Sequence, residues 1–269
     1  MTGLRPVATT QIIIFNVFKI PIFTYKIFLI LGIMKKLLIA SLLISSCRLF
    51  AQNEVYDYGT FFLTIENTTL KAFRPDSTIF YQKEFFRPQD FSVDLDSDGV
   101  DEFLITDYSQ TSGKKFYTLY VYCTLDTFYL VDSVFSGLME PYQVISNELK
   151  TTLLATGNPD FDSLNSSDSL FFLPLNFWKY EEGGLFLANA SVYDLFISEN
   201  DDIIDFIENF YLRSGASCTS SSVIKAAIAS AFINYFNAGE KSFAAKFLKK
   251  YYLCPDAEDF KNKILRLLK

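Results

Sequence analysis

Carboxylates recur at every second residue in one short stretch of this chain, which reads Asp94-Leu95-Asp96-Ser97-Asp98-Gly99-Val100-Asp101-Glu102. Calcium is a hard cation that takes about six to eight oxygen ligands, and alternate carboxylates on a tight turn can point at one centre. A glycine in the turn lets the backbone double back. The pattern predicts a Ca²⁺ site whose ligands are the side chains of Asp94, Asp96, Asp98 and Glu102 and the backbone carbonyl of Val100.

The residues around this loop distinguish it from an EF-hand. An EF-hand has helices on both sides and a bidentate Glu at its last position, whereas Ile105 stands there and both flanks are strand-like. An aspartate-rich loop followed directly by an apolar strand resembles the calcium loops of FG-GAP/VCBS repeats, the integrin-type repeats of exported bacterial proteins. The resemblance covers about residues 90–125. It implies a single calcium-loop repeat, which does not support a closed β-propeller. An acidic turn without a metal is the alternative.

Composition excludes several classes of function. The formal net charge is −7 and the pI is about 4.8, which argues against a nucleic-acid partner. The chain has no histidine, so a histidine general base, a Ser-His-Asp triad and a histidine-ligated zinc are excluded. We therefore expect a non-catalytic protein. A glycoside hydrolase that works with two carboxylates is the alternative from another class.

The N-terminal part reads as an export signal. Residues 34–51 have a positive start at Met34-Lys35-Lys36, a short apolar run and a small-residue exit at Ala51. We expect an over-extended start before Met34 and cleavage after Ala51, with a membrane anchor in residues 1–33 as the alternative. The segment ending at Cys47 resembles a lipobox, so a lipoprotein attached to the membrane through Cys47 stays open.

Export has consequences for partners and for cysteines. We expect a periplasmic, secreted or outer-membrane-associated protein that binds an unidentified protein or glycan, and a lipid-anchored enzyme inhibitor is a further alternative. Disulfides persist in exported proteins. Cys218 and Cys254 each lie at the end of a predicted helix, and they are the expected pair. Cys123 lies in an apolar run and is expected to be a buried free thiol.

The remaining chain predicts an α+β fold in two domains. Residues 52–190 form a β-rich domain with the calcium loop, and residues 191–269 form a helical domain. Ser109–Lys114 is expected to be a polar loop, and Leu173–Leu187 a hairpin. Gly157–Ser169 is expected to be a long surface loop, whose Asp160 and Asp162 lack the further ligands of a second cation site.

The helical part consists of short, amphipathic segments with short links, which favours antiparallel packing. Asn200 is expected to be the N-cap of a helix over Asp201–Leu212, because Asp201, Asp202 and Asp205 would then lie near its positive end. The other expected helices are residues 222–237, Glu240–Tyr252 and a last helix that begins at Pro255-Asp256.

Overall fold

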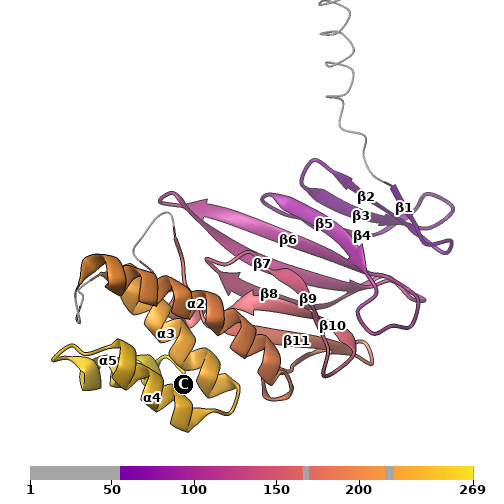
Figure 1. Ribbon diagram of the computed structural model, residues 1–269. Coiled ribbons are helices and arrows are strands. Elements are labelled where there is room, and N and C mark those ends of the chain that lie inside the picture. Colours follow the sequence, from indigo (N-terminus) through magenta and orange to yellow (C-terminus); the bar gives the residue numbers. More distant parts are fainter. Residues whose placement is uncertain (1–54, 166–169, 216–217, 219–220, 269) are drawn as a thin grey trace, which may run out of the picture. The chain divides into compact units, whose positions relative to one another are not determined.

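The structure, a computed structural model, describes residues 55–165, 170–215, 218 and 221–268, which form an α+β fold (Figure 1). Strands fill the first half of this range and helices fill the end, as the sequence predicts. The expected start and signal segment, including Cys47 and Ala51, lie outside the described residues.

The twelve strands of the described residues form three antiparallel sheets of four strands each, and within each sheet a strand pairs with the next one along the chain. The first sheet contains β1 (Val55–Asp57), β2 (Phe62–Glu66), β3 (Thr69–Phe73) and β4 (Ile79–Glu84). The second contains β5 (Pro88–Val93), β6 (Glu102–Thr111), β7 (Lys114–Cys123) and β8 (Tyr129–Gly137). The third contains β9 (Tyr142–Ser146), β10 (Thr151–Gly157), β11 (Leu175–Glu181) and β12 (Gly184–Leu187).

The second sheet has a hydrophobic neighbour on each face. Phe103 and Ile105 of β6 pack in one cluster with residues of the first sheet such as Leu63. Leu104, between them, packs in a different cluster with Leu154 of the third sheet. Side chains alternate between the two faces of a strand. Because both faces of β6 are covered, the strand needs apolar residues at consecutive positions. This apolar run begins directly after the aspartate-rich loop.

Two tight turns join neighbouring strands, and the sequence predicted one of them correctly and the other with the wrong extent. Glu182 and Gly183 have positive φ and connect β11 to β12, which confirms the hairpin expected over Leu173–Leu187. The loop expected over Ser109–Lys114 is wrong in extent. β6 continues to Thr111, and only Ser112 and Gly113, again with positive φ, separate it from β7. Cross-strand pairing here overrides the polar character of the residues.

Four helices follow the third sheet: α2 (Tyr193–Ser214), α3 (Ser222–Asn237), α4 (Lys241–Tyr251) and α5 (Ala257–Arg266). A 3-10 turn, η2 (Asn189–Ser191), precedes them. Phe196 of α2 packs edge-on against Phe177 of β11, with ring centroids 4.9 Å apart. The largest core cluster lies among the helices and includes Leu138 from the end of β8. The described strands and helices form one compact unit.

The expected start of α2 is wrong. The helix begins at Tyr193, and Asn200 lies inside it, fully buried. The Asn200 amide nitrogen donates to the carbonyl oxygen of Ala231 at 3.1 Å, and its oxygen accepts from the amide nitrogen of Asn234 at 3.0 Å. Partners on α3 therefore satisfy both the amide nitrogen and the amide oxygen of Asn200. Packing of Phe196 on the third sheet extends the helix toward its N-terminus, beyond the position where Asn200 would cap it.

The stretch expected as a surface loop over Gly157–Ser169 is partly helical and partly buried. It contains the 3-10 helix η1 (Pro159–Leu164), in which Phe161 and Leu164 belong to the helical core. Residues 166–169 lie outside the described part. Burial of the apolar side chains of Phe161 and Leu164 holds this otherwise polar stretch against the helical core.

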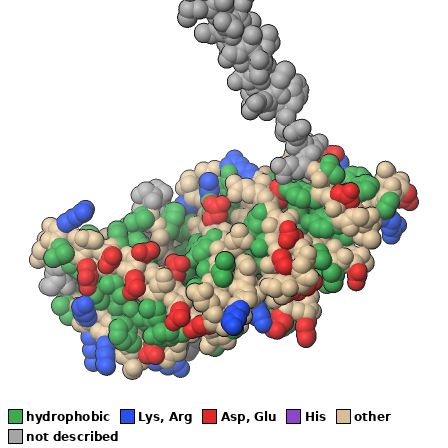
Figure 2. All heavy atoms as spheres, turned by 45° about the vertical axis from the view of Figure 1, so that its right-hand side comes forward, with side chains coloured by type: hydrophobic (Ala, Val, Ile, Leu, Met, Phe, Trp, Pro, Cys, Tyr) green, Lys and Arg blue, Asp and Glu red, His purple; other side chains and the backbone are tan. Residues whose placement is uncertain are grey.

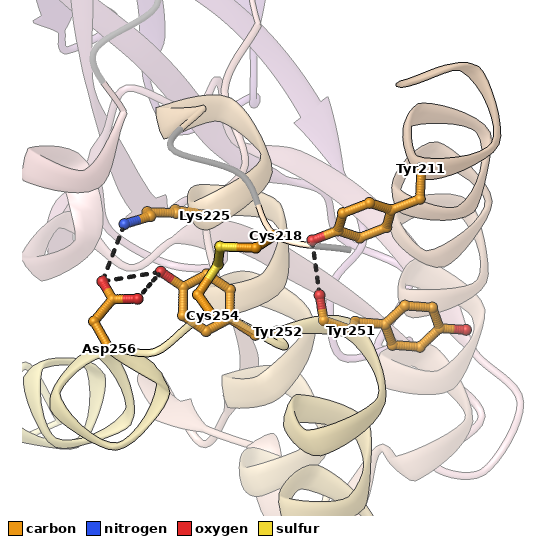
Figure 3. The surroundings of a disulfide bond; sticks show 7 residues. All are labelled: Tyr211, Cys218, Lys225, Tyr251, Tyr252, Cys254 and Asp256. Atoms are coloured by element: carbon orange, nitrogen blue, oxygen red, sulfur yellow. Dashed lines mark hydrogen bonds and ion pairs between the residues drawn. A yellow bond between two sulfur atoms is a disulfide. The ribbon is translucent and has the colours of Figure 1, made fainter. Parts of the chain in front are cut away.

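The disulfide between Cys218 and Cys254 is present, as expected, with 4.9 Å between the two Cα atoms (Figure 3). It joins the segment between α2 and α3 to the segment between α4 and α5. Close to it, the Tyr211 hydroxyl donates to the carbonyl oxygen of Tyr251 at 2.8 Å, and the Tyr252 hydroxyl donates to Asp256 at 3.0 Å. Cys123 is a buried free thiol, which confirms the expectation.

Candidate calcium site

The aspartate-rich loop connects the end of β5 to the start of β6. Leu95, between the first two aspartates, is fully buried in the cluster that joins the second and third sheets. One apolar side chain therefore fixes the loop, while the alternate residues Asp94 and Asp96 point elsewhere. Burial of Leu95 therefore holds the acidic loop against the second and third sheets.

The loop makes its turn around the side chain of Asp94. One carboxylate oxygen of Asp94 accepts from the backbone N–H of Ser97 at 2.7 Å, and the other accepts from Gly99 at 3.0 Å. Ser97 has φ of 66° and Gly99 has φ of 90°. Positive φ is accessible to glycine without strain, so Gly99 allows the chain to reverse within a few residues.

Three carboxylates converge in this loop. Asp94, Asp96 and Glu102 each offer an oxygen, and these oxygens lie within 4.8 Å of one another. Two oxygens bound to one calcium ion at about 2.3–2.6 Å each lie at most about 5 Å apart. The spacing of the three acids therefore fits a single Ca²⁺ ion, and oxygen donors are the ligands that this ion prefers.

Glu102 is the buried member of the group, with only 3% of its surface exposed. Its carboxylate accepts from the backbone N–H of Leu95 at 2.9 Å. Burial raises the pKa of Glu102 to about 7, and repulsion from Asp96 and Asp98 adds to the effect. Burial also raises the pKa of Asp96, again with repulsion from neighbouring aspartates. Either a proton or a bound cation can offset negative charge at this point.

No basic side chain supplies that charge within the described ranges. The five ion pairs there lie elsewhere, and none involves an acid of the loop. The carboxylates contact backbone N–H groups, which orient them and leave their charge in place. This set of oxygen donors could hold a metal cation.

The remaining predicted ligands are the Asp98 carboxylate and the Val100 carbonyl, and a hydrogen bond links these two residues. Asp98 lies outside the converging group, and its carboxylate accepts from the backbone N–H of Val100 at 2.7 Å. The backbone N–H of Asp98 itself donates to Asp96 at 3.2 Å. Asp98 therefore shapes the end of the turn and adds negative charge beside the converging group.

Sequence reasoning missed two threonines that hold the loop. The Thr151 hydroxyl, on β10, donates to the carbonyl oxygen of Leu95 at 2.7 Å. The Thr124 hydroxyl, just after β7, donates to the carbonyl oxygen of Asp101. Both threonines are far from the loop in sequence, and nothing in the linear pattern marks them.

Among the described residues, Asp160 and Asp162 do not belong to a group of three acids that could hold a metal ion. Asp162 accepts from the backbone N–H of Leu138 at 3.2 Å, and its carboxylate lies so close to Gly137 that a Cβ atom there would come within 2.5 Å of it. Burial raises the pKa of Asp162 to about 6. Asp162 therefore has a structural contact with the end of β8.

Comparison with known proteins returned no matching family model, no matching curated protein and no matching solved structure. In the part of the chain that the structure describes, none of the helices is both long and apolar enough to cross a bilayer.

Proposed function

We propose that this protein is an exported calcium-binding protein, in which a single ion in the Asp94–Glu102 loop has a structural role and the protein acts by binding, without catalysis. The convergence of Asp94, Asp96 and Glu102 carries the proposal. The resemblance of this loop to FG-GAP/VCBS calcium loops supports the same ion. An export signal in residues 34–51 would place the protein where calcium is abundant.

The structural role follows from the place of the loop. Its residues contact the start of β10 through Thr151 and the end of β7 through Thr124. Without a cation, the clustered carboxylates repel one another, and each pair costs about 1 kcal/mol or more at an effective dielectric near 20. An ion between them removes this repulsion and stabilises the packing of the second sheet on the third. Affinity on the order of 10⁻⁴ to 10⁻³ M is typical of extracellular modules.

Thermal unfolding with calcium and with a chelator tests the proposal. At about 10 mM Ca²⁺, this affinity gives about 1.4–2.7 kcal/mol of added stability by mass action, and thus a Tm several degrees higher. The double variant Asp96→Asn with Glu102→Gln should lose the calcium shift and should be more stable than the wild type in chelator, because two repelling charges are gone. Asp98→Asn should lose less of the shift, since Asp98 lies outside the converging group.

The matched control is Asp126→Asn, which removes one exposed carboxylate in the turn between β7 and β8. It should keep the full calcium shift. An equal shift in the Asp96/Glu102 double variant would refute the site. Calcium-dependent hydrolysis of a polysaccharide or ester by the purified protein would refute the non-catalytic role.

A further inference from the structure

A second surface feature, separate from the calcium loop, is an open cleft of about 360 Å³ between the β9 end of the third sheet and α2. Its apolar walls are formed by Met139, Phe171, Phe172, Leu173, Leu175 and Ile203. An apolar wall of this size is large enough for the stem of a long side chain. These apolar residues come from the β8–β9 connection, the segment before β11, the first residue of β11, and α2.

Three carboxylates also line this cleft: Glu140, Glu199 and Asp202. The Tyr142 hydroxyl donates to the Glu199 carboxylate at 2.7 Å. Burial raises the pKa of Tyr142, so its phenol stays neutral and orients Glu199 without cancelling the charge. Burial also raises the pKa of Tyr117, and its neighbour Glu140 adds to the effect.

These charges are not matched by the protein. The cleft has no Lys or Arg among its described lining residues, and the ion pairs found within the described ranges do not include its three acids. Figure 2 shows acidic side chains beside hydrophobic patches on one face of the molecule. A concave, partly apolar site strengthens the attraction of such acids for a cation.

A bare metal ion does not fit this cleft. Within the described residues, the calcium loop is the one place where three acids converge closely enough for a single ion, so Glu140, Glu199 and Asp202 are more widely spread. A long basic side chain fits better, because its apolar stem lies along the wall while its charged end reaches several carboxylates. The two phenylalanines serve as apolar wall, because the Lys114 ammonium already lies 5.9 Å from the centre of the Phe171 ring and Phe172 packs against Phe206 with 4.7 Å between ring centroids.

We infer that this cleft binds a lysine or arginine side chain of a partner polypeptide. The stem of that side chain lies against Phe171, Phe172 and Ile203, and its cation lies among Glu140, Glu199 and Asp202. This inference gives chemical content to the binding role proposed above, but it uses a different part of the molecule. The cleft and the calcium site can therefore be tested independently.

The experiment is an NMR titration of the protein, saturated with calcium, with capped pentapeptides. Each peptide has four glycines and a central lysine, arginine or norleucine, the last of which keeps the apolar stem and lacks the charge. The lysine and arginine peptides should shift the backbone amides of Glu140, Phe172 and Asp202. They should bind at least about fivefold more tightly than the norleucine peptide, since about 1 kcal/mol is the scale of partly exposed ion pairs.

The variant Glu199→Gln with Asp202→Asn should weaken binding of the lysine peptide at least about fivefold, because two of the three carboxylates are lost. The matched control, Asp201→Asn with Asp205→Asn, removes the same charge from exposed positions of α2 that do not line the cleft. It should leave the affinity within about twofold. Equal binding of the norleucine peptide, or equal loss in both double variants, would overturn the inference.

The calcium variant Asp96→Asn with Glu102→Gln separates this inference from the proposed function. It should bind the lysine peptide as the wild type does, although its calcium shift is lost. Loss of peptide binding in this variant, with the fold intact by circular dichroism, would show that the peptide binds at the calcium loop and would also overturn the inference.

Discussion

The hydroxyl of Thr151 donates a hydrogen bond to the carbonyl oxygen of Leu95, 2.7 Å away, and so joins the third sheet to the Asp94–Glu102 loop of the second. The exposed fraction is 9% for Thr151 and 0% for Leu95. A buried carbonyl without a partner is costly, so this contact fixes the backbone between two of the converging aspartates. The geometry of the candidate ion site therefore depends on a residue more than fifty positions away.

Thr151→Val tests this relationship. Valine keeps the shape of threonine but cannot donate, so the Leu95 carbonyl loses its partner, and we expect a loss of about 1–3 kcal/mol in the free energy of unfolding. Calcium affinity should fall as well, since the loop between Asp94 and Asp96 is less well held. Urea unfolding and calcium titration measure the two effects. Thr152→Val is the control, because Thr152 lies on the opposite face of β10.

Calcium should protect backbone amides from hydrogen exchange in two separate places. One is residues 94–104, and the other is the start of β10 at residues 151–153, which contacts the loop through Thr151. The turn at Ser112-Gly113 should be unaffected, because it lies at the far end of the ten-residue strand β6, about 30 Å away. Equal protection of the helices from Ser222 onward would contradict a local structural role for the ion.

Loss of the Cys218–Cys254 disulfide should lower stability by about 3–4 kcal/mol, because the two cysteines are 36 residues apart and the bridge restricts the unfolded chain. The double variant Cys218→Ser with Cys254→Ser, measured by urea unfolding, gives this value. Reductant should destabilise the wild type by a similar amount and leave the double variant unchanged. Cys123→Ala is the control for reductant sensitivity. Complete alkylation of Cys218 and Cys254 without prior reduction would refute the bridge in solution.

Asp162 should make stability fall as the pH rises from about 4 to about 6. Its pKa is raised from an ordinary value of 3.8 to about 6 in the folded protein, so between these values the folded state binds a proton that the unfolded state has lost. The side chain is half-buried, and solvent screening limits the effect to about 1 kcal/mol.

Asp162→Asn should flatten this part of the stability curve, since the amide oxygen still accepts from Leu138 but carries no charge. Asp160→Asn, in the same short helix, should keep the slope. Denaturant unfolding at pH 4, 5, 6 and 7 compares the three proteins. A slope in Asp162→Asn equal to that of the wild type would assign the titration to another group.

The sequence alone determined the features that depend on neighbouring residues. Alternate carboxylates with Gly99 predict a turn that gathers the side chains of Asp94, Asp96, Asp98 and Glu102, because spacing along one turn sets which side chains meet. Three of the four converge, and Asp98 does not. The apolar run after the loop predicts β6, and the repeat of apolar residues predicts α3 over residues 222–237. The pairing of Cys218 with Cys254 followed from their places at the ends of predicted helices and from the expectation of export.

Only the tertiary structure decided the features that depend on distant partners. Asn200 has a strong local preference for a helix start, yet Phe196 packs on the third sheet and Asn234 bonds the buried amide, so the helix begins earlier. Thr151 and Leu95 meet because the second and third sheets stack, and no periodicity within one segment encodes which sheet faces which. The same stacking buries Glu102 and places α2 beside the acidic cleft, since burial is set by the whole packed chain.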